Sequence, residues 1–535
     1  MSGRRKGWRY PADIRRDLEL IDVQEPARAA AWVQERVARM PHHWGRLIAD
    51  EHRQRGGQDD AAANRWLFEA TEQAGGLVKL SASDADIRVA AKIASGEAKS
   101  RAMVLQGGAG DVLDSLQHTC GRWGVAPAEP RKREGQIDIL PAIARMICDR
   151  WWLRKLRVAA GQRCERAAIG AGLVKRGRWV YASQDTVERR RQQRRRQQEA
   201  IEGALLQDIE SGEQVALADV VAGSVSNPEI KRGELMTRIK GCDEFAAGKG
   251  WSCEFWTVTA PSRFHPQTTR GGRVAVNPAW DGSTPRQAQS YLCKLWAKAR
   301  AKWQRRGLQV VGLRTVEPHH DATPHWHLIV YGEAAVLESA RDILRQHALA
   351  DSPDEPGAQQ RRCSWLRASG LDGAAYAAKY IAKNIDGRAM EGAASDETGG
   401  KVADALLRVE AWARTWRIRQ FQFFGVPLVG VWRALRKIRQ ACAPADEAIE
   451  QARAAADRGA WAAFWQAIEG REVKLLREAG ERLTVYGDEA ARRVVGVVDG
   501  ATSALLDLRA WVVKWGALRA AARAGGGRGS LVPCL

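Results

Sequence analysis

Four of the chain's ten histidines fall within one stretch of nine residues, at His319, His320, His325 and His327. The last two flank Trp326 in the run HWHLIVY, whose β-branched and aromatic residues are typical of a strand. Because residues i and i+2 of a strand point to the same face, His325 and His327 are expected to present two imidazoles side by side. Neutral imidazole is a common metal ligand, so this spacing indicates a candidate metal site.

A third ligand can come from the segment just before this strand. If Pro318–Pro324 forms the turn of a hairpin, Glu317 falls opposite His325 on the preceding strand. Two imidazoles and one carboxylate would leave coordination positions for water and a phosphate oxygen, so that a divalent ion could act as a Lewis acid on a phosphodiester. The third ligand stays open at this point, because His319 or His320 could replace Glu317. Histidine pairs at this spacing also occur on ordinary protein surfaces.

Two tyrosines follow downstream, in the sequence LDGAAYAAKYIAKNIDG. Tyr376 and Tyr380 are four residues apart in a helix-forming run, which places them one turn apart on one face, with about 6 Å between Cβ atoms. A phenol is a poor nucleophile at its ordinary pKa of about 10, but a nearby ammonium or metal ion favours the phenolate. Lys379 and Lys383, each three residues after a tyrosine, could supply such a charge. A helix that packs both tyrosines into the core is the alternative interpretation.

The segments around these residues alternate between strand and helix patterns. Helix start signals at Thr284-Pro285 and a stop at Gly307 bound one of the helices. The order strand–helix–strand–strand–helix predicts an α+β fold with a central antiparallel sheet and flanking helices. The predicted strands are Cys253–Thr259, Gln309–Glu317 and His325–Tyr331, and the further predicted helices are Ala335–Leu349 and Gly373–Asn384.

The regions on either side of this domain are expected to be largely helical. Composition divides the chain into a helical N-terminal region (1–130), a basic helical region (131–242), the domain with the candidate site (243–440) and an Ala/Arg-rich helical region with a disordered tail (441–535). The basic region contains an arginine run, Val187–Ile201. That run is either a solvated linker helix or a surface that follows phosphates, and the sequence favours neither.

The overall charge favours a polyanionic partner. The formal net charge is +21 and the isoelectric point is about 9.9, and neutralising phosphates supplies most non-specific affinity for nucleic acid. The nine cysteines form no CxxC pair, so neither a disulfide framework nor a zinc knuckle is indicated. The sequence shows no signal peptide and no apolar run long enough for a membrane span, so we expect no membrane partner and a reducing cytoplasm.

With both motifs identified, the chain resembles the bacteriophage replication gene A proteins, which are rolling-circle initiators of the HUH (histidine–hydrophobic–histidine) endonuclease class. His325-Trp326-His327 matches the histidine motif, and Tyr376 with Tyr380 matches the paired-tyrosine motif. The resemblance is specific over about Asp243–Arg439. Further local matches are Phe255–His265, Thr284–Lys298, Glu317–Leu328 and Ala411–Pro427.

This resemblance implies an enzyme that nicks single-stranded or unwound origin DNA, in the cytoplasm of a bacterial host. One tyrosine would form a 5′-phosphotyrosine link and free a 3′-hydroxyl, and the second tyrosine would later close the circle. Mg²⁺ or Mn²⁺ would be the cofactor. The 3′ end would prime a host DNA polymerase, and a host helicase would unwind the duplex, since the sequence contains no GxxxxGK[ST] loop.

The same residues allow three other interpretations. A transposase or conjugative relaxase would share the same HUH chemistry. A non-catalytic origin-binding protein could carry a structural histidine pair, although the intact pairs of histidines and tyrosines argue against decay. A metallonuclease that uses water would not need the tyrosines, so changing both to phenylalanine separates it from the covalent mechanism.

Overall fold

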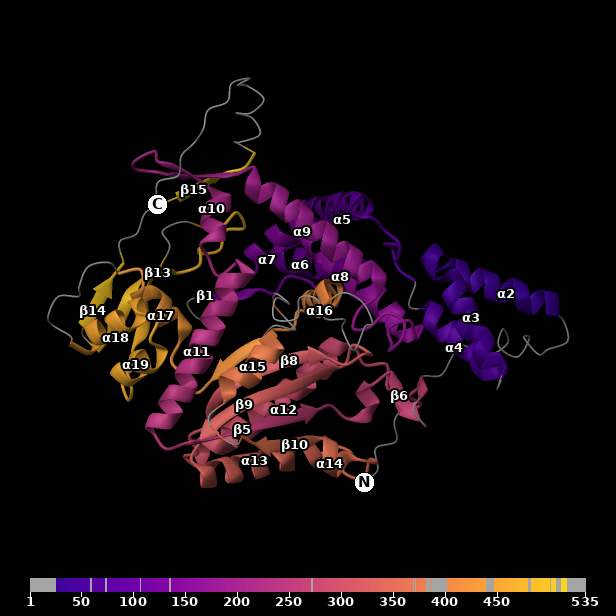
Figure 1. The fold of residues 1–535 in the computed structure, drawn as a ribbon. Coiled ribbons are helices and arrows are strands. Elements are labelled where there is room, and N and C mark those ends of the chain that lie inside the picture. The colour runs from indigo at the N-terminus through magenta and orange to yellow at the C-terminus, as the bar shows by residue number, and fades with distance from the viewer. Residues whose placement is uncertain are drawn as a thin grey trace, which may run out of the picture.

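The structure is a computed structural model of the 535-residue chain. It describes residues 26–57, 60–72, 75–105, 107–133, 136–270, 273–368, 370, 372–381, 385, 402–438, 447–479, 483–500, 502–506 and 511–516. Helices and antiparallel sheets together make an α+β protein, as predicted (Figure 1). No helix among the described residues is long and apolar enough to cross a membrane.

An antiparallel sheet lies at the centre of the candidate-site domain. Within the described part of the chain it has five strands in the order β10-β5-β9-β8-β11. All three predicted strands are confirmed, and they form the middle of this sheet. The strands are β5 (Ser252–Thr259), β8 (Val311–Pro318), β9 (Pro324–Gly332), β10 (Cys363–Arg367) and β11 (Phe421–Phe424).

One face of the sheet is covered by α12 (Pro285–Arg305) and α13 (Ala334–Leu349). The predicted start of α12 is confirmed, because Thr284 accepts a hydrogen bond from the backbone N–H of Gln287 in a capping box. The strand residues with even numbers, such as Trp256 and Leu328, pack against these helices in a buried hydrophobic core. This face therefore holds the sheet together and leaves the opposite face for the histidines.

The opposite face is covered at one end only by helices from distant parts of the chain. Odd-numbered strand residues such as Ile329 and Tyr331 pack there against α11 (Pro228–Gly248) and α15 (Gly373–Ile381). Further along, α17 (Val429–Leu435), α18 (Glu447–Asp457) and α19 (Trp461–Ala467) complete this second core.

The N-terminal half is mostly helical, as expected, and packs beside the sheet domain (Figure 1). The arginine run lies on α9 (Gln184–Glu202), whose first turns are buried and whose later turns are exposed. The other elements are α2 (Pro26–Ala38), α3 (Gly45–Gly56), α4 (Asp60–Glu72), α5 (Asp84–Val104), α6 (Ala109–Arg122), β1 (Arg131–Arg133), β2 (Gln136–Asp138), α7 (Leu140–Met146) and α8 (Asp149–Gly170).

The described C-terminal segments differ from the helical expectation. After α19 they form β12 (Lys474–Glu478), β13 (Arg493–Asp499), β14 (Thr502–Leu505) and β15 (Trp511–Lys514). The valine pairs in RVVGVVD and WVVK explain this, because β-branched side chains fit a pleated sheet and overcome the helical bias of the surrounding Ala/Arg composition. The tail predicted to be disordered, after residue 516, lies outside the described residues.

Short elements link these parts of the chain. β15 pairs with β3, which places the C-terminal strand beside the segment that follows α9. These linking elements are β3 (Leu205–Asp208), β4 (Gln214–Ala216), α10 (Leu217–Ala222), β6 (Gln267–Arg270), β7 (Arg273–Val276) and α14 (Ala358–Arg361), with single helical turns at His42–Trp44 and Ser262–Phe264.

Candidate active site

The two histidines of the HxH motif stand side by side on the sheet face opposite α12 and α13. Pro318 pairs with Pro324 across the predicted hairpin, and Glu317 lies directly opposite His325, as expected. The rings of His325 and His327 are 4.5 Å apart between centroids. The side chain of His327 turns Nε2 toward Glu317, whose Oε2 is 3.9 Å away, and turns Nδ1 toward the neighbouring strand β5.

Two threonines on β5 contact the Nδ1 atoms of the two histidines. Thr257 Oγ1 lies 3.4 Å from Nδ1 of His327, and Thr259 Oγ1 lies 3.5 Å from Nδ1 of His325. Contacts that occupy Nδ1 leave Nε2 as the nitrogen directed to a ligand, which is how outer partners orient metal-binding histidines. The sequence did not single out these threonines, although their period-two spacing on β5 matches that of the histidines.

The other two histidines of the cluster have separate surroundings. The ring of His319 packs edge-on against that of His325 at 4.5 Å, so it belongs to the same group. The ring of His320 instead stacks on Tyr181, 6.0 Å away and nearly parallel. Of the two alternatives to Glu317 as third ligand, the geometry therefore favours His319 and does not favour His320.

An ion pair between His265 and Asp321, which the sequence did not indicate, lies next to His319. His265 contacts the ring of His319 at 5.1 Å, and its Nδ1 lies 3.0 Å from Oδ2 of Asp321 in the hairpin turn. Burial lowers the pKa of His265, but the nearby carboxylate outweighs it, so the pKa lies above its ordinary value. Burial likewise raises the pKa of Asp321, and the charge of His265 outweighs it and holds that pKa well below its ordinary value. This pair fixes the turn that carries His319.

Two imidazoles and a carboxylate are suitable ligands for a divalent cation, but their present spacing is not that of a complete site. The 3.9 Å between His327 Nε2 and Glu317 Oε2 fits within one coordination sphere, because two opposite bonds of ~2.1 Å span about 4.2 Å. Among the described residues, however, no group of three or more His, Cys, Asp or Glu side chains is close enough to hold an ion as it stands. A metal site formed by His325, His327 and Glu317 therefore remains a prediction.

Both tyrosines face this site from helix α15. Tyr380 Oη lies 3.4 Å from Nδ1 of His327 and donates a hydrogen bond to Tyr376 Oη at 2.9 Å. The Tyr376 ring stacks on Phe255 of β5, with 3.7 Å between centroids. Tyr380 is thus the tyrosine nearer the histidines, and Tyr376 lies one turn behind it. Burial, followed by the contact with Tyr376, raises the pKa of Tyr380 well above its ordinary value, so the phenol is protonated in this arrangement.

Helix α15 is anchored at its first turn by an aspartate on α11. Asp243 accepts hydrogen bonds from the backbone N–H groups of Gly373 and Ala374, at 3.1 and 2.9 Å, and from the Tyr331 hydroxyl at 2.8 Å. A Cβ on Gly373 would lie 2.0 Å from that hydroxyl, so only glycine permits this close approach. Asp243 therefore sets where both tyrosines stand relative to the sheet.

The two lysines of the predicted site are not placed by the structure. Lys379 lies within α15, but its side chain is outside the described part of the structure. Lys383 also lies outside the described residues. Their assistance to the tyrosines stays a prediction from the spacing.

The part of the chain that holds this site is similar to known proteins. The family model of the bacteriophage replication gene A protein (GPA) matches residues 107–388, which include the histidine and tyrosine motifs. The replication gene A protein of Escherichia phage P2 is 38% identical over 387 residues, or 68% of this chain and 50% of that protein. The probable replication protein P12 of Pseudoalteromonas phage PM2 is 37% identical over 384 residues, or 68% of this chain and 59% of that protein.

A bacterial relative carries a name that states an activity. The probable replication endonuclease from prophage-like region 1 of Salmonella typhi is 32% identical over 385 residues, covering 68% of this chain and 47% of that protein. The chain therefore spans only about half the length of the curated relatives it matches. No solved structure matches it. From the extent of the family match, the chain belongs to the bacteriophage replication gene A protein family.

Proposed function

We propose that this protein nicks and rejoins DNA to start rolling-circle replication. Its substrate is single-stranded or unwound origin DNA, and its nucleophile is Tyr380 or Tyr376. The observation that carries the proposal is the meeting of the two motifs, with Tyr380 Oη 3.4 Å from a ring nitrogen of His327 and 2.9 Å from Tyr376 Oη. The names of the relatives, replication gene A protein and replication endonuclease, support the same role.

In the proposed reaction a tyrosine replaces the 3′ oxygen at the scissile phosphate. The phenol loses its proton, a bond forms between Oη and phosphorus, the bond from phosphorus to the 3′ oxygen breaks, and that oxygen takes up a proton. The energy of the broken ester is kept in the phosphotyrosine, so rejoining needs no ATP. Because both hydroxyl groups lie within hydrogen-bond distance, the second tyrosine can reach the same position after one round of replication.

A divalent cation, Mg²⁺ or Mn²⁺, fits this proposal as the group that polarises the phosphate and favours the phenolate. His325 and His327 would hold it, with Glu317 or His319 as a third ligand. Thr257 and Thr259 would keep the imidazoles oriented through their Nδ1 atoms. The raised pKa of Tyr380 gives the reason that such a charge is needed.

The products define the expected partners. The free 3′-hydroxyl is a primer for a host DNA polymerase, and the duplex ahead of it needs a host helicase, because the sequence carries no GxxxxGK[ST] loop. Two other functions share part of this site. A transposase or relaxase would use the same tyrosines and histidines on another DNA substrate, and a non-catalytic origin-binding protein would bind DNA without cutting it.

The double variant Tyr376→Phe/Tyr380→Phe tests the proposal directly. We expect it to lose at least 10³-fold of the nicking rate on oligonucleotides cut by the wild-type protein, because no nucleophile remains at the phosphate. Binding of single-stranded DNA, measured by fluorescence anisotropy, should stay within about 2-fold of wild type. Tyr486→Phe, whose hydroxyl contacts Cys148 and Arg154 and not the anchor of α15, is a control that removes a hydroxyl without removing a nucleophile. Undiminished cleavage by the double variant would indicate a nuclease that uses water.

A further inference from the structure

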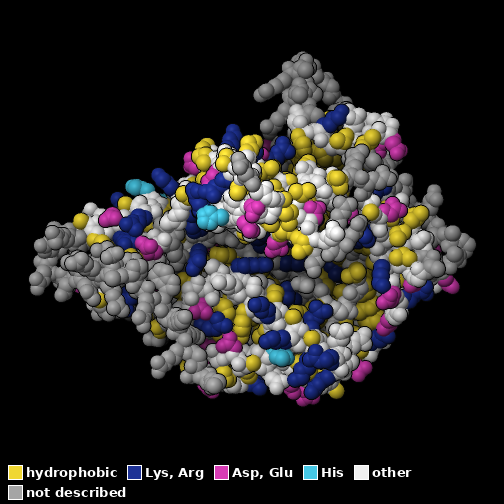
Figure 2. All heavy atoms as spheres, turned by 180° about the vertical axis from the view of Figure 1, so that it is seen from behind, with side chains coloured by type: hydrophobic (Ala, Val, Ile, Leu, Met, Phe, Trp, Pro, Cys, Tyr) yellow, Lys and Arg dark blue, Asp and Glu magenta, His cyan; other side chains and the backbone are white. Residues whose placement is uncertain are grey.

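A second feature of the molecule is a large basic cleft of about 1740 Å³ beside the sheet. Helices α9, α11 and α16 (Val402–Trp416) and strand β11 form its walls. Among the described residues that line it, nine are Arg or Lys and two are Glu. The face of the molecule in Figure 2 is hollowed across its middle, with Lys and Arg side chains along the hollow. Such a surplus of positive charge suits a polyanion.

The two glutamates of the cleft are already neutralised by arginines. Glu410 pairs with Arg190 at 2.5 Å and with Arg194 at 2.7 Å, and Glu234 pairs with Arg433 at 2.6 Å. The two pairs of Glu410 also join the arginine run of α9 to α16, so the run is part of a cleft wall and not a free linker helix. The remaining basic residues must therefore find their counter-charge elsewhere.

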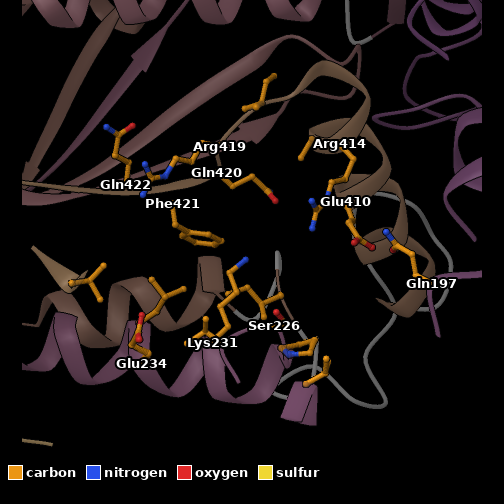
Figure 3. A pocket seen from close by; sticks show the side chains of 18 of the residues that line it. Gln197, Ser226, Lys231, Glu234, Glu410, Arg414, Arg419, Gln420, Phe421 and Gln422 are labelled. Carbon is orange, nitrogen blue, oxygen red and sulfur yellow. The ribbon is translucent and has the colours of Figure 1, made fainter. Parts of the chain in front are cut away.

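Like charges face one another across the open space of this cleft. Lys231 on α11 and Arg414 on α16 point into the same space, as does Gln420 of the segment before β11 (Figure 3). The two carboxylates that line the described cleft form their ion pairs with Arg190, Arg194 and Arg433, and not with Lys231, Arg414 or Arg419. Burial first, and then the charge of Arg414, lowers the pKa of Lys231, and Glu410 offsets this only in part. An anion bound between them would relieve this repulsion.

Aromatic and amide side chains lie among the charges. The Lys231 ammonium is 5.9 Å from the ring centroid of Phe421, and Trp515 at the edge of the cleft is 66% exposed. Gln420, just before β11, and Gln422 on that strand add amide groups to the cleft lining. Aromatic rings that stack on bases, set in a basic groove that follows the backbone, are how proteins hold single-stranded nucleic acid.

The cleft begins on the same face of the sheet as the candidate active site. His327 of β9 pairs with Thr315 of β8, and Thr315 pairs with Phe421 of β11. Residues directly opposite in antiparallel strands point to one face, and adjacent strands are about 4.8 Å apart. Phe421 therefore stands about 10 Å from His327 along the sheet, which is a distance of one or two nucleotides on an extended strand.

We propose that this cleft binds the single-stranded DNA that continues from the scissile phosphate. Lys231, Arg414 and Arg419 contact its phosphates, and the exposed ring of Trp515 at the edge of the cleft stacks on a base. This inference rests on the proposed function, because the nicking site supplies the strand that enters the cleft. A single strand fits better than a duplex, since an exposed aromatic ring at the groove needs an unpaired base to stack on.

The test measures binding without cleavage, so that it does not depend on the nicking proposal. Fluorescence anisotropy with a labelled oligothymidylate of about 20 nucleotides, in EDTA and at several salt concentrations, compares Lys231→Glu/Arg414→Glu with wild type. We expect at least 10-fold weaker binding and a smaller slope of log K against log salt, by about 1.4 for two lost phosphate contacts. The matched control is Arg305→Glu/Arg306→Glu, which makes the same charge change at the exposed end of α12, on the other face of the sheet. We expect its affinity to stay within about 2-fold of wild type.

Three results would overturn the proposal. The cleft variant could bind the oligonucleotide as wild type does, the control could lose as much affinity as the cleft variant, or the loss could appear only with duplex DNA. Circular dichroism and thermal unfolding verify that the variants are folded. If charge reversal prevents folding, Lys231→Gln/Arg414→Gln replaces it, with a smaller loss in the same direction. The variant Tyr376→Phe/Tyr380→Phe is measured in the same binding assay. Because it lacks both tyrosine hydroxyls and keeps the cleft, its binding distinguishes a failure of the cleft proposal from a failure of the nicking proposal.

Discussion

At the scale of single residues, the candidate site is a continuous line of ring contacts along one sheet face. The tyrosine pair lies at one end of this line, the HxH motif in the middle and the His265–Asp321 ion pair at the other end. Ring centroids are 5.0 Å apart between Tyr376 and Tyr380, and 4.5 Å apart between Tyr380 and His327. Because each ring touches the next, a change in one side chain alters the position of its neighbours.

The first prediction concerns the metal. His325→Ala should lower divalent-metal affinity by at least about 10-fold, because ligand and outer-partner changes typically cost 10- to 100-fold. Isothermal titration calorimetry with Mn²⁺ measures this loss, and Mn²⁺-dependent cleavage should fall with it. His320→Ala is the control, since that ring stacks on Tyr181 away from the site. Equal metal affinity in wild type and His325→Ala would show that the ligand assignment is wrong.

The second prediction concerns the ion pair of His265 and Asp321. Asp321→Asn should lower the pKa of His265 below that in wild type, because burial remains and the opposing carboxylate is gone. The depressed pKa of Asp321 stabilises the fold above about pH 4, and the raised pKa of His265 stabilises it until the pH passes that folded pKa. The difference in unfolding free energy between wild type and variant should therefore be largest between about pH 4 and 6.5, at about 1.5–3 kcal/mol, and smaller near pH 9.

NMR titration of the His265 ring and denaturant unfolding at several pH values check this second prediction. His52→Gln, in the N-terminal helices, is a control for the loss of a partly buried histidine contact elsewhere. A His265 pKa that stays the same in Asp321→Asn would contradict the account of this pair.

The sequence indicated the two motifs but not all of their neighbours. Glu317, His325 and His327 were predictable because a short hairpin sets their register locally. His265 and Asp321 are 56 residues apart, so no local spacing connects them, although the matched segment Phe255–His265 ended at one of them. The choice between His319 and His320 depends on which way each turn residue points, and only the packing on Tyr181 decides it.

At the scale of elements, the site depends on how α15 is held over the sheet. Sequence patterns predicted the central strands β5, β8 and β9 and the helix with the tyrosines. They did not predict the edge strands β10 and β11, which have five and four residues and pair with strands far away in the chain. Such short strands have too little alternation to be recognised, and long-range pairing decides their structure.

The third prediction tests the anchor of α15. Asp243→Ala removes the acceptor of three hydrogen bonds at Gly373, Ala374 and Tyr331 and should loosen the first turn of α15. Nicking should fall by about 10- to 100-fold, because a misplacement of about 1 Å can cost that much. Metal affinity should remain within about 2-fold, since the histidines lie on the sheet and not on α15. Glu244→Ala, an exposed neighbour on the same helix, should have no effect. Wild-type nicking rates in Asp243→Ala would show that this aspartate does not position the tyrosines.

At the scale of the whole molecule, helices from both sides of the chain complete the sheet domain. The N-terminal helix α9 and the later helix α16 are joined by ion pairs through Glu410, and α11 and α15 cover the same face as the histidines. The net charge of +21 predicted a polyanionic partner, and the cleft shows where part of that charge gathers. Composition alone could not locate it, because the lining residues come from separate parts of the chain.

A covalent-adduct experiment tests the central claim most directly. The full chain, Mn²⁺ and labelled single-stranded oligonucleotides from the DNA around its own gene would be mixed, denatured in detergent and separated on a gel. The account predicts a metal-dependent band in which the DNA is joined to protein through its 5′ end, with mass spectrometry placing the link on Tyr380 or Tyr376. Cleavage that leaves no protein-linked DNA, or a link to another residue, would contradict it.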